Sequence, residues 1–145
     1  MDFDVDLGLL ESNAIYSDTN QVADDDAYIY NFQVAESETL YSEINLGNFQ
    51  DDLDLELWEW NNISNNWELL ASSESPENQD ESIFKVIGPG QYSIDIKNYA
   101  DLDDNNAPSG YDLEIDNQSW LSTVAIPDDP LFTCLLYTSD AADEL

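Results

Sequence analysis

The sequence predicts an all-β protein, an antiparallel, jelly-roll-like β-sandwich of about seven to eight strands. Three observations predict this fold class. Apolar and polar residues alternate with a period of two in short runs between residues 28 and 115, as they do in half-buried strands. Segments rich in Gly, Pro, Asn and Asp separate these runs at nearly even spacing. Hydrophobic residues make up 42% of the 145 residues, which is enough to bury one core.

The expected strands follow from the individual runs. In residues 53–57, three leucines alternate with two carboxylates, so the leucines face inward and the carboxylates face water. A leading strand is also expected around Ala14 to Tyr16, and the alternation stops after Ile115. The seven main runs span residues 28–34, 40–46, 53–57, 67–71, 83–87, 92–96 and 111–115. The Asn-rich segment 61–66 is expected to form a loop longer than a tight hairpin turn.

The charge of the chain restricts its partners. There are 33 acidic residues against two basic ones, which gives a formal net charge of −31. Binding to nucleic acid is excluded because it needs clusters of Lys and Arg, and anionic membrane surfaces are disfavoured for the same reason. Cations, and divalent ones above all, are the natural partners of such a surface. The alternative is that the charge only maintains solubility.

Several kinds of chemistry are excluded by composition. The chain has no His, which removes Ser-His-Asp and Cys-His catalysis and imidazole zinc sites. A single Cys cannot form an internal disulfide. Residues 1–4 show no basic or apolar signal-peptide region, and no stretch has the length of a transmembrane helix. The sequence therefore predicts a chain without catalytic residues of its own.

Four motifs, in their order along the chain, resemble the bacterial pre-peptidase C-terminal domain family. They are a D-x-Y-x-F strand at 26–32, a D-L-D-L strand at 51–58, a G-x-G-x-Y turn at 88–94 and a closing Y-x-L strand at 109–113. The resemblance covers roughly residues 20 to 116. It implies a jelly-roll-like sandwich that is attached to a secreted protease, often binds metal and has no catalytic activity. The implied location is extracellular, and the implied partner is a downstream catalytic domain of the same chain.

Two further resemblances concern the C-terminal end. Residues 125–132 are similar to the segment that leads into subtilisin-like serine protease domains, and residues 134–144 resemble translated sequencing adapter. The expected organisation is a lead-in segment at 1–23, the β-sandwich at 24–117, a linker into a truncated protease domain at 118–132, and adapter at 133–145.

Two groups of acidic residues are candidate calcium ligands. Asp101, Asp103, Asn105 and Asp112 have the alternating spacing of a calcium loop, whose hard oxygen ligands number six to eight. A solvated hairpin turn is the competing interpretation. A second group consists of Asp51, Asp52 and Asp54, with residues 24–26 as further candidates. Close carboxylates repel unless a cation or a proton lies between them. The competing interpretation is that Asp54 simply faces water.

Trp58 and Trp60 are expected on the strand face opposite the inward leucines. An exposed aromatic pair suits carbohydrate or protein binding, whereas two partly buried rings would only cover the edge of the sandwich. The leading hypothesis is a calcium-responsive accessory domain that supports a protease or binds its protein or polysaccharide substrate. The alternative is a carbohydrate- or matrix-binding module that uses Trp58 and Trp60. An intrinsic enzyme with paired carboxylates ranks third.

Overall fold

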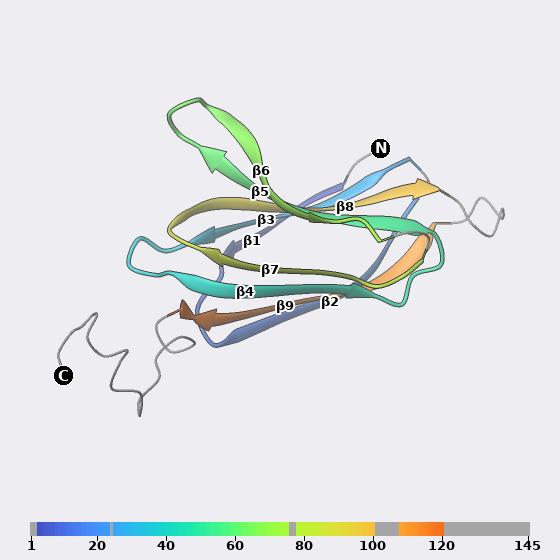
Figure 1. Ribbon diagram of the computed structural model, residues 1–145, viewed down its shortest axis with the longest axis horizontal. Coiled ribbons are helices and arrows are strands. Elements are labelled where there is room, and N and C mark those ends of the chain that lie inside the picture. Colours follow the sequence, from blue (N-terminus) through green and yellow to red (C-terminus); the bar gives the residue numbers. More distant parts are fainter. Residues whose placement is uncertain (1–2, 24, 76–77, 101–107, 121–145) are drawn as a thin grey trace.

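The computed structural model describes residues 3–23, 25–75, 78–100 and 108–120. These residues form two facing sheets, and the predicted all-β sandwich is confirmed (Figure 1). Nine strands are present instead of seven to eight. They are β1 (Phe3–Leu9), β2 (Ala14–Val22), β3 (Ala27–Val34), β4 (Leu40–Gly47), β5 (Asp52–Asn61), β6 (Asn66–Ser73), β7 (Glu81–Ile87), β8 (Gly90–Ala100) and β9 (Ser109–Ser119). No helix in the described part of the chain is long and apolar enough to span a membrane.

The two sheets are built almost entirely from antiparallel pairs. One sheet has the strand order β1-β3-β8-β5-β6, and the other has the order β2-β9-β4-β7. The exception to the predicted antiparallel pattern is β1, which pairs with β3 in parallel. This pairing arises because β2, the strand between them in sequence, belongs to the other sheet. The chain therefore returns to the first sheet in its original direction.

Strands extend beyond the seven main runs at both ends of the sandwich. Residues of the expected lead-in segment form β1 and β2, and β2 pairs along its whole length with β9. Both strands lie at sheet edges, where half-exposed side chains give a weak hydrophobic pattern. At the other end, the inward row of β9 continues past Ile115 to Asn117, which is buried. The sequence signal ends there because the inward residue is polar.

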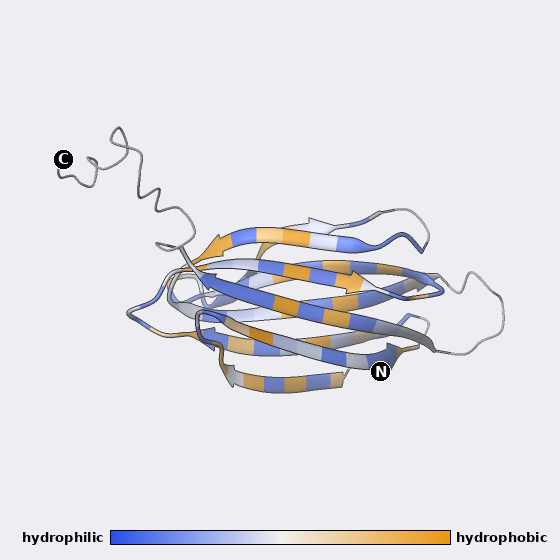
Figure 2. Ribbon diagram, turned by 90° about the horizontal axis from the view of Figure 1, so that it is seen from below, coloured by the Kyte–Doolittle hydropathy of each residue, from blue (hydrophilic) through white to orange (hydrophobic). Residues whose placement is uncertain are grey.

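The core lies between the two sheets. Figure 2 shows hydrophobic and hydrophilic residues alternating along the strands, as the period-two runs predict. Burying a leucine or isoleucine side chain stabilises the fold by roughly 1.5–3 kcal/mol. The largest fully buried side chains are Tyr30, Phe32, Leu40, Ile44, Leu46, Leu53, Leu55, Leu57, Ile87, Tyr92, Ile94 and Tyr111.

The turn before β8 explains the G-x-G-x-Y motif. Gly90 has a φ of 151°, which side-chain-bearing residues rarely adopt. Two residues later, the Tyr92 ring is buried and its hydroxyl donates a hydrogen bond of 2.7 Å to the carbonyl of Gly88. The motif therefore fixes the corner at which the chain enters β8.

The β5–β6 hairpin ends in a turn longer than a tight two-residue turn, as the sequence predicts. The strands stay paired as far as Asn61 and Asn66, which leaves a four-residue turn, 62–65. The Asn61 side-chain oxygen accepts bonds from the backbone N–H of Ile63 (2.8 Å) and of Ser64 (3.2 Å), so the asparagines stabilise the turn. The tip of this hairpin projects away from the sandwich (Figure 1).

Candidate functional site

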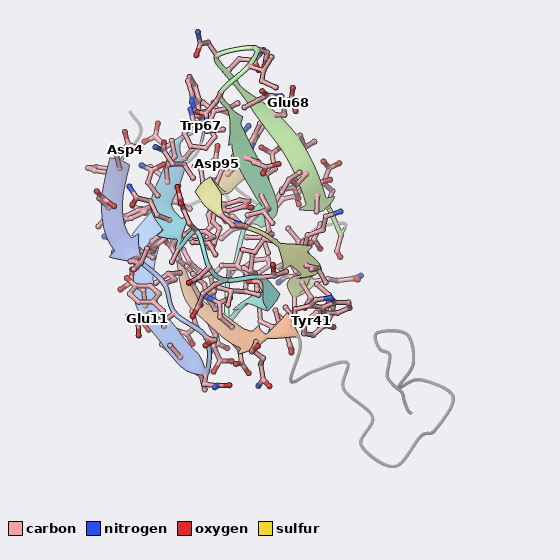
Figure 3. All side chains as sticks on the ribbon, turned by 90° about the vertical axis from the view of Figure 1, so that its left-hand side faces the viewer. Asp4, Glu11, Tyr41, Trp67, Glu68 and Asp95 are labelled. Carbon is pink, nitrogen blue, oxygen red and sulfur yellow. The ribbon has the colours of Figure 1, made fainter. Side chains whose placement is uncertain are left out.

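The outer face of the five-stranded sheet carries a groove, which we call the aromatic groove. Its volume is about 540 Å³, and its lining residues are Asp4, Ile29, Asn31, Trp58, Trp67, Ser93 and Asp95. Cross-strand register places Asp4 beside Ile29, and Ile29 beside Asp95. Figure 3 shows Trp67 and Asp95 near each other, with Asp4 on the same side of the molecule. The groove therefore combines an apolar floor position, two carboxylates and two indoles.

Trp58 is held in place by two charged neighbours. Its indole N–H donates a hydrogen bond of 3.0 Å to Oε1 of Glu56. The same oxygen is 3.0 Å from Nζ of Lys97, which lies 6.0 Å from the centre of the Trp58 ring. Glu56 is only 7% exposed, so Lys97 neutralises a carboxylate that has lost most of its contact with water.

The two tryptophans predicted as one platform lie in different hollows. Trp60 lines a separate hollow of about 430 Å³ together with Asn61, Pro89 and Gln91. Trp58 shares the aromatic groove with Trp67 instead. Trp60 and Trp67 are opposite each other in the hairpin, with ring centres 5.5 Å apart in an edge-to-face arrangement.

Trp67 lines the groove, although only Trp58 and Trp60 were predicted as ligand-binding residues. It is 39% exposed and lies on β6, whose alternation is weak because β6 is an edge strand. A signal was available, since a turn centred between Asn61 and Asn66 places residue 67 opposite residue 60. Ile29 was also detectable as an apolar residue at an outward position of β3.

The carboxylate of Asp95 lies in an environment that favours its neutral form. Burial is the main cause of its raised pKa, and the negative charges of Glu56 and Asp4 add to the effect. A hydrogen bond of 2.8 Å from the Ser93 hydroxyl and the positive charge of Lys97 act in the opposite direction without cancelling it. The aromatic groove therefore contains a carboxylate whose loss of contact with water is not balanced by the nearby positive charge.

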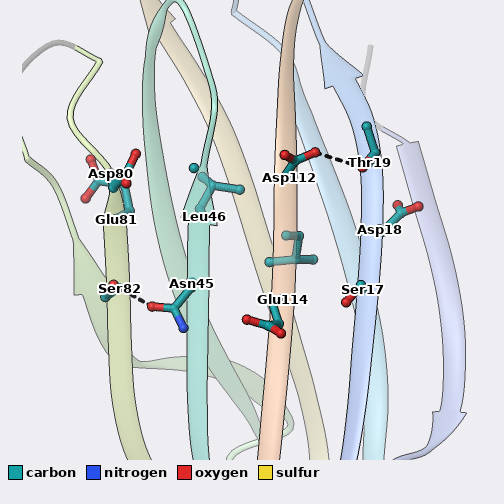
Figure 4. Close-up of a pocket in the computed structure, with 12 residues that line it drawn as sticks. Ser17, Asp18, Thr19, Asn45, Leu46, Asp80, Glu81, Ser82, Asp112 and Glu114 are labelled. Atoms are coloured by element: carbon teal, nitrogen blue, oxygen red, sulfur yellow. Dashed lines mark hydrogen bonds between the residues drawn. The ribbon is translucent and has the colours of Figure 1, made fainter.

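A second groove of similar volume, about 540 Å³, lies on the four-stranded sheet (Figure 4). Hydroxyl and amide side chains surround its carboxylates, which come from Asp18, Asp80, Glu81, Asp112 and Glu114. Asp112, predicted as a calcium ligand, accepts hydrogen bonds from the Thr19 hydroxyl (2.8 Å) and the Asn48 amide (2.6 Å). These bonds lower its pKa. The other members of the predicted calcium loop, Asp101, Asp103 and Asn105, lie outside the described residues.

Asp51 is part of a buried polar cluster at one end of the sandwich. The side-chain amide of Asn98 donates to Oδ2 of Asp51 (3.2 Å) and to the carbonyl of Val22 (3.1 Å). The Ser109 hydroxyl accepts from the backbone N–H of Asp51 (3.3 Å). Asp51, Asn98 and Ser109 are each at most 2% exposed. The cluster joins the end of β2, the start of β5, and strands β8 and β9.

Asp52 and Asp54 lie on the outward side of β5 and interact with each other rather than forming a triad with Asp51. Burial raises the pKa of Asp54 to about 7, and repulsion from Asp52, Glu81, Glu74 and Glu56 contributes. The Glu81 carboxylate is held in position, because it accepts hydrogen bonds from the Ser73 hydroxyl (2.5 Å) and the Ser75 backbone N–H. Asp54 is therefore partly protonated near neutral pH.

The described residues only partly fit a calcium ion. Oδ1 of Asn98 is buried and has no hydrogen-bond partner among them, and it belongs to the amide that contacts Asp51. Calcium needs six to eight oxygen ligands. No group of three or more His, Cys, Asp or Glu side chains in the described part of the chain is arranged to hold a metal ion. The buried cluster thus offers suitable oxygens without a complete coordination shell.

Comparison with known proteins reveals similarity of fold. No family model matches the sequence, and no curated protein matches it. The pre-peptidase C-terminal domain of a collagenase from Bacillus anthracis superposes with a TM-score of 0.52 at 16% identity, covering 79% of this chain and 94% of that domain. PliG, a periplasmic inhibitor of g-type lysozyme from Aeromonas hydrophila, superposes with a TM-score of 0.50 at 9% identity, covering 81% of this chain and all of PliG. The chain therefore has a fold like that of a pre-peptidase C-terminal domain.

Proposed function

We propose that this chain is a non-catalytic accessory domain of a secreted protease. The observation that carries the proposal is the sandwich itself, which matches a collagenase pre-peptidase C-terminal domain over 94% of that domain's length. The order of four sequence motifs across residues 26–113 supports the same assignment. The domain would support a downstream catalytic domain or bind its substrate, and the subtilisin-like segment at 125–132 makes a serine protease the proposed parent.

We further propose that calcium stabilises this domain. The buried Asp51 and Asn98 side chains provide oxygen atoms at a junction of four strands. A cation there would interact with the Asp51 carboxylate and satisfy the Asn98 oxygen, and water would complete the shell. The ion would act on stability, since it would bind the folded chain and not the unfolded one.

Thermal unfolding tests the calcium part of the proposal. The full chain is melted with calcium, with magnesium and with chelator at one ionic strength, because screening alone would raise stability with either ion. A calcium-specific gain of about 2.7 kcal/mol is expected at a hundredfold excess over the dissociation constant. Asp51→Asn should abolish the gain, and Glu114→Gln, which removes a carboxylate from the outer face of the other sheet, should leave it intact. Equal curves in all three buffers would contradict the calcium proposal.

Co-sedimentation tests the accessory role and separates it from the carbohydrate-binding alternative. The chain is incubated with insoluble collagen and with cellulose and chitin. Retention on protein and not on polysaccharide supports the accessory domain. Retention on polysaccharide that Trp58→Ala or Trp60→Ala removes would favour the alternative. The geometry gives that alternative less support, because the two tryptophans lie in different hollows and Trp58 is engaged by Glu56. Hydrolysis of a protein or glycan by the chain would overturn both.

A further inference from the structure

The aromatic groove places negatively charged side chains on both sides of the apolar residue Ile29. Across the sheet, Ile29 has Asp4 on one side and Asp95 on the other, and Glu56 follows Asp95 on β5. Three of the four residues in this row are therefore carboxylates. Like charges directly opposite each other on neighbouring strands destabilise a sheet. An arrangement of this kind gains free energy when a positive charge enters it.

The one lysine on this face leaves Asp4 and Asp95 short of positive charge. Nζ of Lys97 is 3.0 Å from the carboxylate of Glu56, which is more deeply buried than any other acid in the row. Burial still raises the pKa of Asp95 in spite of Lys97. A cation in the groove would reverse this shift by favouring the ionised carboxylate.

The other lining residues define what kind of cation fits. Trp58 and Trp67 line the same groove as Asp4 and Asp95, and Ile29 adds an aliphatic surface. Indole rings attract cations through their quadrupole, and they attract the planar guanidinium group especially well. The methylene stem of a long basic side chain gains from contact with apolar groups. A hydrated metal ion would gain nothing from the indoles or from Ile29.

We propose that the aromatic groove binds an arginine side chain presented by a partner protein. The carboxylates of Asp4 and Asp95 would accept hydrogen bonds from the guanidinium group, and Trp58 and Trp67 would contact its face. The net charge of −31 would speed the approach of a basic partner, while the groove would select the residue that docks. This inference holds whether or not the parent protein is a protease.

Indole N–H signals in a nitrogen–proton NMR titration of the full chain test this inference. The probe is a blocked Gly-Ser peptide that contains one arginine, measured at physiological ionic strength, where charges more than about 8 Å apart are largely screened. The Trp58 and Trp67 signals should shift with one common dissociation constant, and the Trp120 signal should not. The matched peptides carry citrulline, a neutral analogue of the same shape, or lysine. Citrulline should bind about tenfold more weakly, as expected when a charge-assisted bond is lost.

Matched variants identify the residues responsible. Asp95→Asn should weaken arginine binding about tenfold, whereas Glu114→Gln, which removes the same charge from the other sheet, should change it less than twofold. Trp67→Ala should weaken arginine binding. If this variant does not fold, Trp67→Phe, which keeps an aromatic ring, should weaken binding by a smaller factor than Asp95→Asn. The proposal is overturned if citrulline or lysine binds as well as arginine, or if both charge variants behave alike. It is also overturned if the indoles respond only to a chitin or cellulose oligosaccharide.

Discussion

The outer faces of the two sheets carry the same kinds of acidic residue in different surroundings. On the four-stranded sheet, Asp112 is fully exposed to water and accepts bonds from Thr19 and Asn48, which lower its pKa. On the five-stranded sheet, Asp95 lies between Ile29 and Glu56, and burial raises its pKa. The net charge alone therefore says little about function. A carboxylate that water and neutral donors already satisfy has little to gain from a partner, and a partly desolvated one has much to gain.

The largest expected effect comes from removing the cation that belongs to the five-stranded sheet. Lys97→Met should destabilise the fold by about 2 kcal/mol, because it leaves the carboxylate of Glu56 buried without its partner, with a discount for the partial exposure of Lys97. Urea unfolding measures the change. The matched variant is Lys85→Met on β7 of the other sheet, with an expected change below about 0.5 kcal/mol. Equal losses for the two variants would mean that the lysines act only by reducing the net charge.

A gain in stability is expected from Asp54→Asn at pH values above about 7, because the variant removes a carboxylate that is repelled by Asp52 and Glu56. The gain should be about 1 kcal/mol, since solvent screens much of the repulsion at this half-buried position. Glu114→Gln is the control for the loss of one charge and should change stability by less than about 0.5 kcal/mol. If both variants gained equally, general charge reduction would explain the result.

The pH dependence of stability follows from the same carboxylate. The pKa of Asp54 is about 7 in the folded chain and near its ordinary value when unfolded, so the folded chain binds the proton more tightly. The free energy of unfolding should therefore rise as the pH falls through the folded pKa, from about 8 to about 5. Asp54→Asn should flatten this rise in urea titrations. An unchanged slope in the variant would show that other groups carry it.

The smallest expected effects come from Asp95→Asn and Asp112→Asn, which should change the free energy of unfolding in opposite directions. Asp95→Asn should stabilise the fold by about 0.5 kcal/mol, since it removes a partly desolvated charge and retains an oxygen for the Ser93 hydroxyl. Asp112→Asn should destabilise it slightly, because it weakens the bonds from Thr19 and Asn48. Thermal melts at neutral pH in one buffer measure both. Changes of the same sign would remove the distinction between the two faces.

Inward-facing positions could be predicted from the sequence because burial imposes a period of two on apolar residues. Leu53, Leu55 and Leu57 are all completely buried, and Trp58 does lie on the outward side of the same strand. The edge strands β1 and β2 could not be predicted in this way, because they bury only part of one face and their apolar alternation is weak. Polar residues in inward rows, such as Asn98 and Asn117, could not be predicted either, because a buried amide looks like a turn residue in sequence.

The candidate sites were less predictable than the fold because they depend on cross-strand register. Asp51 and Asp54 are close in sequence, yet one is bonded to Asn98 in the interior and the other lies among carboxylates on the outer face. The aromatic groove joins residues from β1, β3, β5, β6 and β8, and no local motif marks that combination. The calcium loop predicted at Asp101, Asp103 and Asn105 lies outside the described residues and stays a prediction.

Carbon-detected NMR titration of the side-chain carboxyl groups measures whether the pKa values of acidic residues on the two faces are shifted in opposite directions. We expect a titration midpoint for Asp95 above the ordinary aspartate pKa of about 3.9 and a midpoint for Asp112 below it. Adding the arginine peptide should lower the Asp95 midpoint and leave that of Asp112 unchanged. Identical midpoints, or a peptide effect of the same size on both residues, would contradict the account.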